Sequence, residues 1–324
     1  MTLPWTLRRT RLLTVLAVVS VLAVGSVAPA AATDTPTPTP TATPVPTPSP
    51  TSTLPPAYVD VALSPRSGST VGIAYPITAT FSAPVSNRAA AEHHMHVYVN
   101  GVFSHGAWFW RTSRVAVFRT AKFWPGHATI VLRMDLAGVT IGGSSRYRFV
   151  GRSTTTRTYT LKTSRALIAH ADAVKHLFSV AIDGKLVKVF KASYGKPGYE
   201  TRTGIKAVMD KFRVRHMTSV AAGITDPRDQ YDVMAPYAVR ITPTGEFVHG
   251  APWATARLGR WNGSHGCSNL AVKDAAWFYS VVIPGDPVVT TGTSRSMEYW
   301  NGTGAPYNIP WTVWLKGSAL KGRA

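Results

Sequence analysis

Apolar and polar residues alternate over short stretches along most of the chain beyond residue 57. An alternation of period two places the apolar side chains on one face of a β-strand. Only residues 273–279 change to a helical period, and Pro284-Gly285 ends that segment. We therefore expect a mainly β fold with one or two short helices. The predicted strands cover residues 78–81, 96–99, 114–118, 129–132, 177–182, 186–190, 205–209, 237–241, 246–249 and 287–291.

The strands divide into two folded units. In residues 57–162, turn signals such as Asn100-Gly101 recur about every ten residues, which is typical of a β-sandwich. Residues 170–292 form a second β-rich unit that contains the helical segment. Residues 293–324 are rich in Trp and Tyr but too few for a core of their own. We expect this C-terminal appendage to pack on the second unit.

The N-terminal segment has the pattern of an export signal. Arg8, Arg9 and Arg11 precede an apolar run, Leu12 to Val24, and small residues suited to cleavage follow at 28–32. The run is shorter than the roughly 20 residues that span a membrane. We predict a signal peptide over residues 1–32, with an uncleaved membrane anchor as the alternative. Residues 33–56, almost entirely Pro, Thr, Ser and Ala, predict an extended linker.

The net charge is +20, or +17 without the three signal-peptide arginines. The basic residues are spread over both units and match no nucleic-acid-binding motif, so we expect no nucleic-acid partner. An exported basic protein is suited to anionic wall polymers, which it would bind through its long-range field. His94 and His96 share one face of a predicted strand, but no third ligand is assignable, so we expect no metal and no cofactor.

Cys267 is the only cysteine of the chain and lies in Ser264-His265-Gly266-Cys267-Ser268-Asn269. It has no partner for an internal disulfide, which leaves a buried structural thiol, an intermolecular bridge or a nucleophile. The neighbouring glycine, which allows close approach of a reacting group, and the histidines favour the nucleophile. His249 is the candidate base, with an ordinary strand-end histidine as the alternative.

This motif, together with His249-Gly250, resembles the signature of the L,D-transpeptidases, whose catalytic domain is called YkuD. The sequence Ser-His-Gly-Cys-x-Asn is similar to that of the actinobacterial branch. The resemblance implies an immunoglobulin-like sandwich followed by a YkuD-type β-rich catalytic domain. It extends to residues 194–197 and 201–204 of the catalytic unit, to residues 308–314 of the C-terminal extension and to residues 64–142 of the immunoglobulin-like domain.

The resemblance also implies a reaction. Cys267 would attack the carbonyl of the third residue of a peptidoglycan tetrapeptide stem, a meso-diaminopimelate, and release D-Ala. The amine of an acceptor stem would then open the thioester and form a 3→3 cross-link. His249 would be the base, oriented by the main-chain carbonyl of Gly250, and the N–H groups of Gly266 and Cys267 would bind the oxyanion. Carbapenem-type inhibitors would acylate Cys267, and the protein would be exported to the cell wall of an actinobacterium.

Other positions carry weaker expectations. Tyr231 matches a family tyrosine that faces the nucleophile and contributes to the oxyanion pocket. Met217 matches a residue that lines the donor pocket, and core packing is the alternative for both. His265 either contacts substrate or stabilises the turn. Asn269 either binds a polar group of the substrate or caps the following helix. We expect the Ser264 hydroxyl to hold the loop.

Two alternative functions follow from the same residues. Water can open a thioester, which would make the protein an L,D-carboxypeptidase. A non-catalytic cell-wall-binding protein would rely on the sandwich and on its charge, and it would tolerate Cys267→Ala. Ser268 departs from the family, whose members usually have an aliphatic residue there, so its hydroxyl needs a partner if it is buried.

Overall fold

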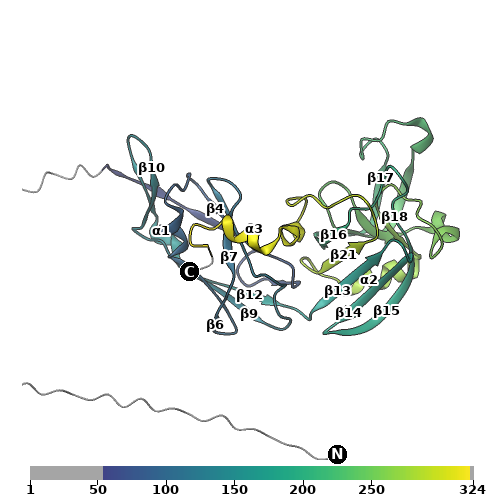
Figure 1. Cartoon of the computed structure of the whole chain (residues 1–324), viewed down its shortest axis with the longest axis horizontal. Helices are drawn as coiled ribbons and strands as arrows, with labels where there is room; N and C mark the ends of the chain where they lie inside the picture. The colour runs from purple at the N-terminus through teal and green to yellow at the C-terminus, as the bar shows by residue number, and fades with distance from the viewer. Residues whose placement is uncertain (1–53, 322–324) are drawn as a thin grey trace, which may run out of the picture. The chain divides into compact units, whose positions relative to one another are not determined.

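The computed structural model describes residues 54–321 (Figure 1). The predicted signal peptide and residues 33–53 of the predicted linker lie outside the described residues. Within residues 54–321, no helix has the length and apolar character needed to cross a membrane. Within the described residues, the sandwich and the second β-rich unit belong to one structural unit.

The first domain is a β-sandwich, as the alternation predicts. Its strands form sheets ordered β1-β11-β10, β2-β4-β8-β7 and β3-β12-β9-β5-β6. The strands are β1 (Pro56–Val59), β2 (Val61–Ser64), β3 (Thr70–Val71), β4 (Ile77–Phe81), β5 (Met95–Val99), β6 (Val102–Phe103), β7 (Ala107–Trp110), β8 (Val115–Arg119), β9 (Thr129–Asp135), β10 (Thr140–Gly143), β11 (Arg148–Gly151) and β12 (Thr156–Thr163). A short helix, α1 (Arg88–Glu92), and a 3₁₀ turn, η1 (Ser153–Thr155), complete the domain.

Large aromatic side chains fill the core between these sheets. The ring of Trp108 meets the edge of Phe118 at 5.2 Å between centroids, and Phe118 stacks on Trp124 at 6.1 Å. Each of these tryptophans is almost fully buried. The predicted turn at Asn100-Gly101 joins β5 to β6, and both residues have positive φ angles, 51° and 82°. That conformation is the one a two-residue type I′ hairpin requires.

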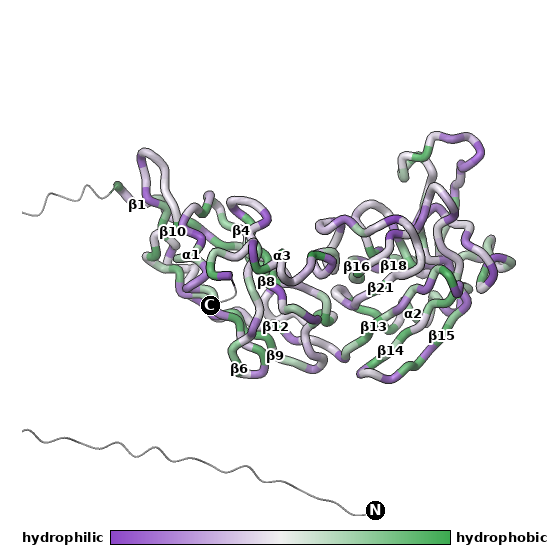
Figure 2. The backbone as a smooth tube through the Cα atoms, in the orientation of Figure 1, coloured by the Kyte–Doolittle hydropathy of each residue, from purple (hydrophilic) through white to green (hydrophobic). Residues whose placement is uncertain are grey.

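The second domain is built on one sheet, ordered β16-β21-β13-β14-β15-β20-β19-β18-β17. Figure 2 shows hydrophobic stretches along β13, β14 and β15. The sheet starts at Leu167, before the predicted boundary at residue 170, because β13 pairs with both β14 and β21. Its strands are β13 (Leu167–Asp172), β14 (Leu177–Ile182), β15 (Lys185–Ser193), β16 (Gly204–Ala207), β17 (Asp210–Thr218), β18 (Asp232–Arg240), β19 (Phe247–Gly250), β20 (Ser268–Leu270) and β21 (Pro287–Thr291).

The predicted helical segment is α2 (Val272–Val281), which buries Phe278 against the sheet. The Phe278 ring meets the edge of Phe178 of β14 at 5.0 Å. Strand β17, whose basic residues interrupt the apolar pattern, was not among the predicted strands. It forms a long antiparallel hairpin with β18. The 3₁₀ segments of this domain are η2 (Pro227–Asp229), η3 (Pro252–Arg257) and η4 (Ala305–Asn308).

The C-terminal appendage packs differently from the expectation. Its first part contacts the second domain, where Asn308 Nδ2 donates to the Ile205 carbonyl at 2.8 Å. Its helix α3 (Trp311–Lys316) packs on the sandwich, beside β7 (Figure 1). There Trp314 is fully buried and its Nε1 donates to the Ala107 carbonyl at 2.9 Å. The apolar face of α3 therefore covers sandwich residues rather than the second domain alone.

Candidate active site

The second domain contains a cavity of about 920 Å³ that brings together most residues singled out in the sequence. This volume is in the range of small-molecule and peptide sites. The β17–β18 hairpin, the start of β19 and the loop before β20 line it. Predicted site residues in the lining are Met217, Tyr231, His249, Ser264, His265, Gly266, Cys267 and Asn269.

The loop before β20 presents Cys267. Gly266 has φ 117°, a left-handed value that side chains disfavour, so a glycine is required at this turn. Ser264 Oγ donates to the Cys267 carbonyl at 2.7 Å and accepts from the Gly266 N–H at 3.2 Å. One hydroxyl therefore closes the turn on both sides of the glycine.

The segment Tyr194–Lys196 holds the start of this loop. The Ser264 N–H donates to the Tyr194 carbonyl at 2.9 Å, and the Lys196 N–H donates to the Ser264 carbonyl at 2.9 Å. Tyr194 is itself fully buried, and its hydroxyl donates to the Leu177 carbonyl at 2.6 Å. The loop that carries Cys267 is thus held by a segment that the sequence resemblance also includes.

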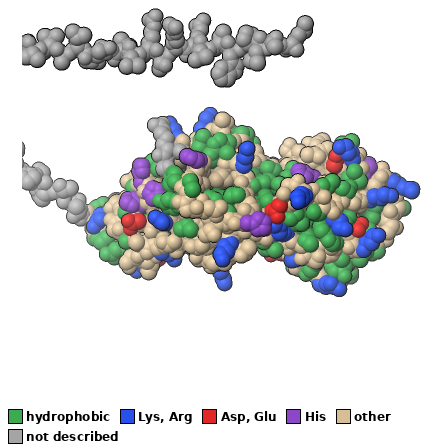
Figure 3. Space-filling model, turned by 90° about the horizontal axis from the view of Figure 1, so that it is seen from below, with side chains coloured by type: hydrophobic (Ala, Val, Ile, Leu, Met, Phe, Trp, Pro, Cys, Tyr) green, Lys and Arg blue, Asp and Glu red, His purple; other side chains and the backbone are tan. Residues whose placement is uncertain are grey.

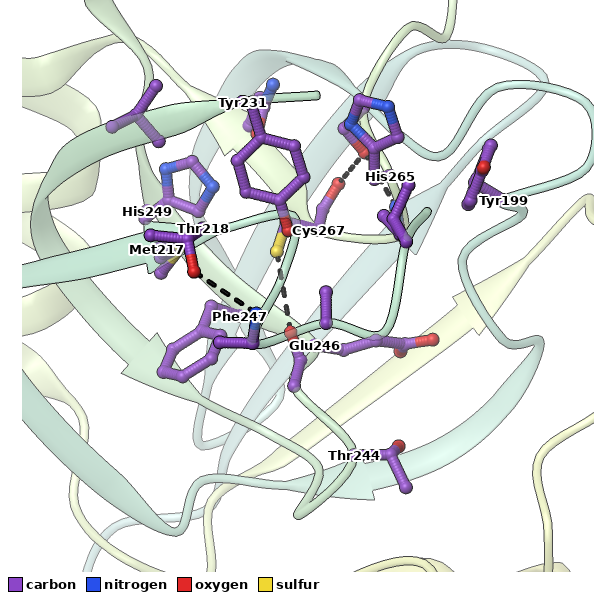
Figure 4. Close-up of a pocket in the computed structure, with 18 of the residues that line it drawn as sticks. Tyr199, Met217, Thr218, Tyr231, Thr244, Glu246, Phe247, His249, His265 and Cys267 are labelled. Atoms are coloured by element: carbon purple, nitrogen blue, oxygen red, sulfur yellow. Dashed lines mark hydrogen bonds between the residues drawn. The ribbon is translucent and has the colours of Figure 1, made fainter. Parts of the chain in front are cut away.

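His249 lies in β19 and is held in one tautomer. Its Nδ1 donates to the Gly250 carbonyl at 2.9 Å, which leaves Nε2 free to accept a proton. Burial lowers the pKa of His249 to about 4, so the ring is neutral near pH 7. In Figure 4 the His249 and Tyr231 side chains point toward the sulfur of Cys267.

The surroundings of Cys267 favour the thiol over the thiolate. Its Sγ–H donates to the Gly245 carbonyl at 3.7 Å, and the Phe247 N–H donates toward the sulfur. Burial raises the pKa of Cys267 to about 12. With His249 neutral as well, the structure favours a thiol and a neutral imidazole at rest rather than a preformed ion pair.

The predicted oxyanion donors differ in their contacts. The Gly266 N–H is engaged by Ser264 Oγ, as described above. Among the described residues, no acceptor is found for the Cys267 N–H. Of the two amides, the Cys267 N–H is therefore the one available to a developing oxyanion without first breaking a hydrogen bond of the loop.

Tyr231 and His265 form one wall of the cavity. Their rings stack at 4.9 Å between centroids, and Tyr199 meets the other side of His265 edge-on at 4.9 Å. His265 Nε2 lies 3.5 Å from Asp229 Oδ1, which is long for a hydrogen bond. Asp229 is paired with Lys196, whose hydrogen bond lowers the pKa of the Asp229 carboxyl. This wall ties the β17–β18 connection to the nucleophile loop.

Asn269 is almost fully buried, and its Oδ1 has no hydrogen-bond donor among the described residues. It does not cap α2, because the N-cap position is Ala271 and has no side-chain cap. Asn269 is a lining residue of the cavity, although its Oδ1 atom is buried in this structure. The Ser268 hydroxyl is buried, but the partner expected for a buried hydroxyl is not found among the described residues.

Several residues of the site were not predicted. Trp253 tilts over His249 at 5.9 Å between rings. Glu246 precedes the strand that carries His249 and is buried beside Cys267. Both residues lie close to His249 in the sequence, and this proximity could have indicated them. Basic side chains also line the cavity, namely Arg202, Arg215, Arg240, Arg257 and Arg295.

Elsewhere the basic side chains are dispersed. On the face shown in Figure 3, Lys and Arg side chains are scattered rather than gathered in one patch. Within residues 54–321, no group of three or more His, Cys, Asp or Glu is arranged to hold a metal ion. His96 of β5 instead packs against the Phe103 ring at 6.0 Å.

A sandwich joined to a β-rich domain with a histidine and a cysteine in one cavity defines a class of two-domain proteins. Comparison with known families identifies that class. The L,D-transpeptidase catalytic domain (YkuD) matches residues 166–290, and a bacterial Ig domain (Big_10) matches residues 30–140.

The chain is similar to several mycobacterial proteins. It is 35% identical to "Probable L,D-transpeptidase 3" of Mycobacterium tuberculosis over 69% of this chain and 83% of that protein. The structure of LD transpeptidase LdtMt1 in complex with imipenem matches 71% of this chain and 98% of its own, with 33% identity and a TM-score of 0.60. The Mycobacterium tuberculosis L,D-transpeptidase 3 complex with a faropenem-derived adduct matches 72% of this chain and 98% of its own, with 34% identity and a TM-score of 0.58.

The chain belongs to the L,D-transpeptidase family, which catalyses peptidoglycan cross-linking. The predicted fold class, an immunoglobulin-like sandwich followed by a YkuD-type domain, is confirmed.

Proposed function

We propose that the protein is an exported L,D-transpeptidase that forms 3→3 peptidoglycan cross-links through a thioester on Cys267. The observation that carries the proposal is the arrangement of His249, whose Nδ1 is bonded to the Gly250 carbonyl while the ring faces the cavity that contains Cys267. This arrangement presents a neutral Nε2 to a neutral thiol, as general-base activation requires.

In the first half of the reaction, the Cys267 sulfur attacks the carbonyl carbon of the third stem residue as His249 Nε2 takes the thiol proton. The new C–S bond places a negative charge on the carbonyl oxygen, near the Cys267 N–H and the Tyr231 hydroxyl. The C–N bond to D-Ala then breaks, and the imidazolium returns its proton to the departing amine. The products are a thioester and free D-Ala.

In the second half, the side-chain amine of an acceptor stem attacks the thioester. The neutral imidazole accepts a proton from the amine, the C–S bond breaks, and the sulfur leaves and is reprotonated. The product is an amide between two stems, and the free thiol is restored. Water in place of the amine would release a tripeptide, which is the L,D-carboxypeptidase alternative.

The lining of the cavity suits an anionic stem. Stem peptides carry free carboxylates, and the arginines of the lining supply cations that attract and orient them. The excess of basic residues over the whole chain, +20 formally, fits retention by anionic wall polymers. Met217 and Tyr231 would contact the donor stem, His265 would support Tyr231, and Asn269 Oδ1 would accept an N–H of the substrate.

The proposal places the protein outside the cytoplasm, in the cell wall of an actinobacterium, with the predicted signal peptide directing export. An uncleaved signal would instead keep it at the membrane. The sandwich would act as a spacer between the linker and the catalytic domain.

Acylation by a β-lactam tests the proposed nucleophile. The mature protein would be mixed with imipenem, the ligand of one similar structure, and its intact mass recorded. We expect one covalent adduct on the wild type and none on Cys267→Ala. A folded wild type that gains no mass, or a Cys267→Ala protein that gains the same mass, would refute the nucleophile.

A further inference from the structure

A network of buried charges lies directly behind the nucleophile. Glu246 is at its centre: Arg202 Nη1 lies 3.0 Å from Oε1, and Lys206 Nζ lies 2.7 Å from Oε2. The side chains of Lys206 and Glu246 are 0% and 4% exposed. Desolvating such charges is costly, and removing one partner leaves the others uncompensated, so the three residues act as a unit.

Glu246 sits between the two backbone groups that contact the sulfur of Cys267. The Gly245 carbonyl accepts from Sγ–H at 3.7 Å, and the Phe247 N–H donates toward Sγ. Figure 4 shows the dashed contact running from the sulfur to the segment that carries Glu246 and Phe247. Any displacement of the Glu246 backbone therefore moves an acceptor and a donor of the thiol together.

One cation that holds Glu246, Lys206, comes from the other end of the sheet order, and Arg202 lies just before the same strand, β16. Lys206 lies in β16, and its Nζ also donates to Thr290 Oγ1 of β21 at 3.2 Å. The Arg202 main-chain N–H donates to Glu246 Oε1 at 2.9 Å, in addition to the side-chain contact. The carboxylate is thus linked through Lys206 to strands β16 and β21, and it is also held directly by the Arg202 main-chain N–H.

Residues of the C-terminal appendage also contact Arg202 and the turn that leads to Glu246. Glu298 Oε2 lies 2.6 Å from Arg202 Nε and accepts from Asn301 Nδ2 at 2.8 Å. Asn301 Nδ2 also donates to Thr244 Oγ1 at 2.9 Å, on the turn that leads to Glu246. The ion pairs of Glu246 and the side-chain amide of Asn301 therefore both hold this turn.

We propose that Arg202, Glu246 and Lys206 are positioning residues that hold the Gly245 carbonyl and the Phe247 N–H against the sulfur of Cys267. The catalytic consequence rests on the proposed function of Cys267. The two charges nearest the sulfur act in opposite directions, since Glu246 raises the pKa of Cys267 and Lys206 lowers it. Their joint removal changes the local field little and isolates the effect of position.

The test is alkylation of the thiol in the double variant Glu246→Leu/Lys206→Met. Cys267 is the only cysteine, so iodoacetamide reports on it without further substitution. Rates would be measured from pH 6 to 10 on the variant and on the wild type. We expect the variant to fold, because apolar replacement of a buried ion pair is often tolerated and Arg202 keeps its pairing with Glu298, and to react about tenfold more slowly at pH 8. The physical reason is loss of the Phe247 N–H from the thiolate.

Two further variants keep the test decisive. Asn301→Ala leaves the ion pairs of Glu246 in place and removes the amide that links Glu298 to Thr244 of the turn, so we expect a smaller fall, about threefold, in the same direction. The matched control is Arg165→Met/Asp286→Asn, which removes another buried ion pair, at 2.9 Å, from a part of the domain that does not line the cavity. We expect the control to alkylate at the wild-type rate whatever it does to stability.

Equal or faster alkylation in both Glu246→Leu/Lys206→Met and Asn301→Ala would overturn the positioning role. An equal fall in the control would do the same, because it would show a general loss of rigidity. The alkylation result can be distinguished from a failure of the proposed function. If Cys267→Ala retained cross-linking activity, the nucleophile would be refuted while alkylation would still decide the positioning of the thiol.

Discussion

Two buried glutamates show how differently the two domains use a carboxylate. Glu92 of the sandwich is 1% exposed and accepts from neutral donors: Trp110 Nε1 at 2.7 Å, Ser318 Oγ at 2.5 Å and the N–H groups of Ala319 and Leu320. Glu246 of the catalytic domain is held instead by Arg202 and Lys206. Glu92 fastens the C-terminal segment to the sandwich, whereas Glu246 sets the backbone beside a thiol.

The same contrast holds for the surroundings of each glutamate. The buried indoles of Trp108, Trp110 and Trp124 all find acceptors within the sandwich. Beside Cys267, the polar atoms Asn269 Oδ1 and Ser268 Oγ have none among the described residues. The sandwich also leaves Arg119 Nε and Tyr159 OH without a partner within residues 54–321, so the two domains differ in where such atoms lie: Asn269, beside Cys267, is part of the lining of the cavity.

The largest expected effect in the catalytic domain comes from His249→Gln. Loss of the base should reduce acylation of Cys267 by about 10²–10⁴-fold, since glutamine cannot accept the thiol proton. Acylation by imipenem, followed by mass spectrometry, measures the rate. His127→Gln is the control, because this exposed histidine lies in the sandwich and pairs with Asp183. A His249→Gln protein that acylates at the control rate would contradict the base.

The next largest expected effect is the pH dependence of Cys267 alkylation. Because the pKa of Cys267 is raised, the thiol form persists through neutral pH, and the rate should climb by up to tenfold per pH unit without levelling off below pH 9. His249, with its pKa lowered to about 4, stays neutral and able to accept a proton down to about pH 5. An alkylation plateau reached already at pH 6 would indicate a preformed ion pair and contradict this account.

In the sandwich the largest effect is one of stability. Trp314→Ala removes a fully buried side chain and its hydrogen bond to Ala107, which should cost about 3–5 kcal/mol of unfolding free energy. Chemical denaturation would measure the loss, and alkylation of Cys267 in the folded variant should proceed near the wild-type rate. Val102→Ala, at a side chain 70% exposed, is the control and should change neither quantity. An unchanged midpoint for Trp314→Ala would show that the helix α3 is not anchored there.

The smallest expected effect is an increase in the free energy of unfolding. Ser268 buries a hydroxyl without a partner, so Ser268→Val should raise the unfolding free energy by about 1 kcal/mol. Ser268→Thr adds the methyl group but keeps the hydroxyl, and it should give little or no gain. Equal gains in both variants would assign the effect to packing volume and not to the unpaired hydroxyl.

The sequence predicted what depends on local pattern. The alternation located ten of the 21 strands of the described residues, the helical period located α2, and the motif around Cys267 located residues that the structure brings to one cavity. The packing of Trp314 on Ala107 was not predictable, because the two residues are 207 positions apart and nothing local pairs them. The Arg202–Glu246–Lys206 network was missed for the same reason, since sheet topology alone brings these charges together.

The most direct test is the reaction of the mature protein with a purified disaccharide-tetrapeptide that contains meso-diaminopimelate. Mass spectrometry would follow the intact protein and the products, with Cys267→Ala in parallel. The account predicts a thioacyl adduct on the wild type with loss of D-Ala, then a cross-linked dimer, and neither product with Cys267→Ala. Free tripeptide without dimer would make the protein a carboxypeptidase, and folded wild-type protein without adduct or turnover would contradict the enzyme and favour a wall-binding protein.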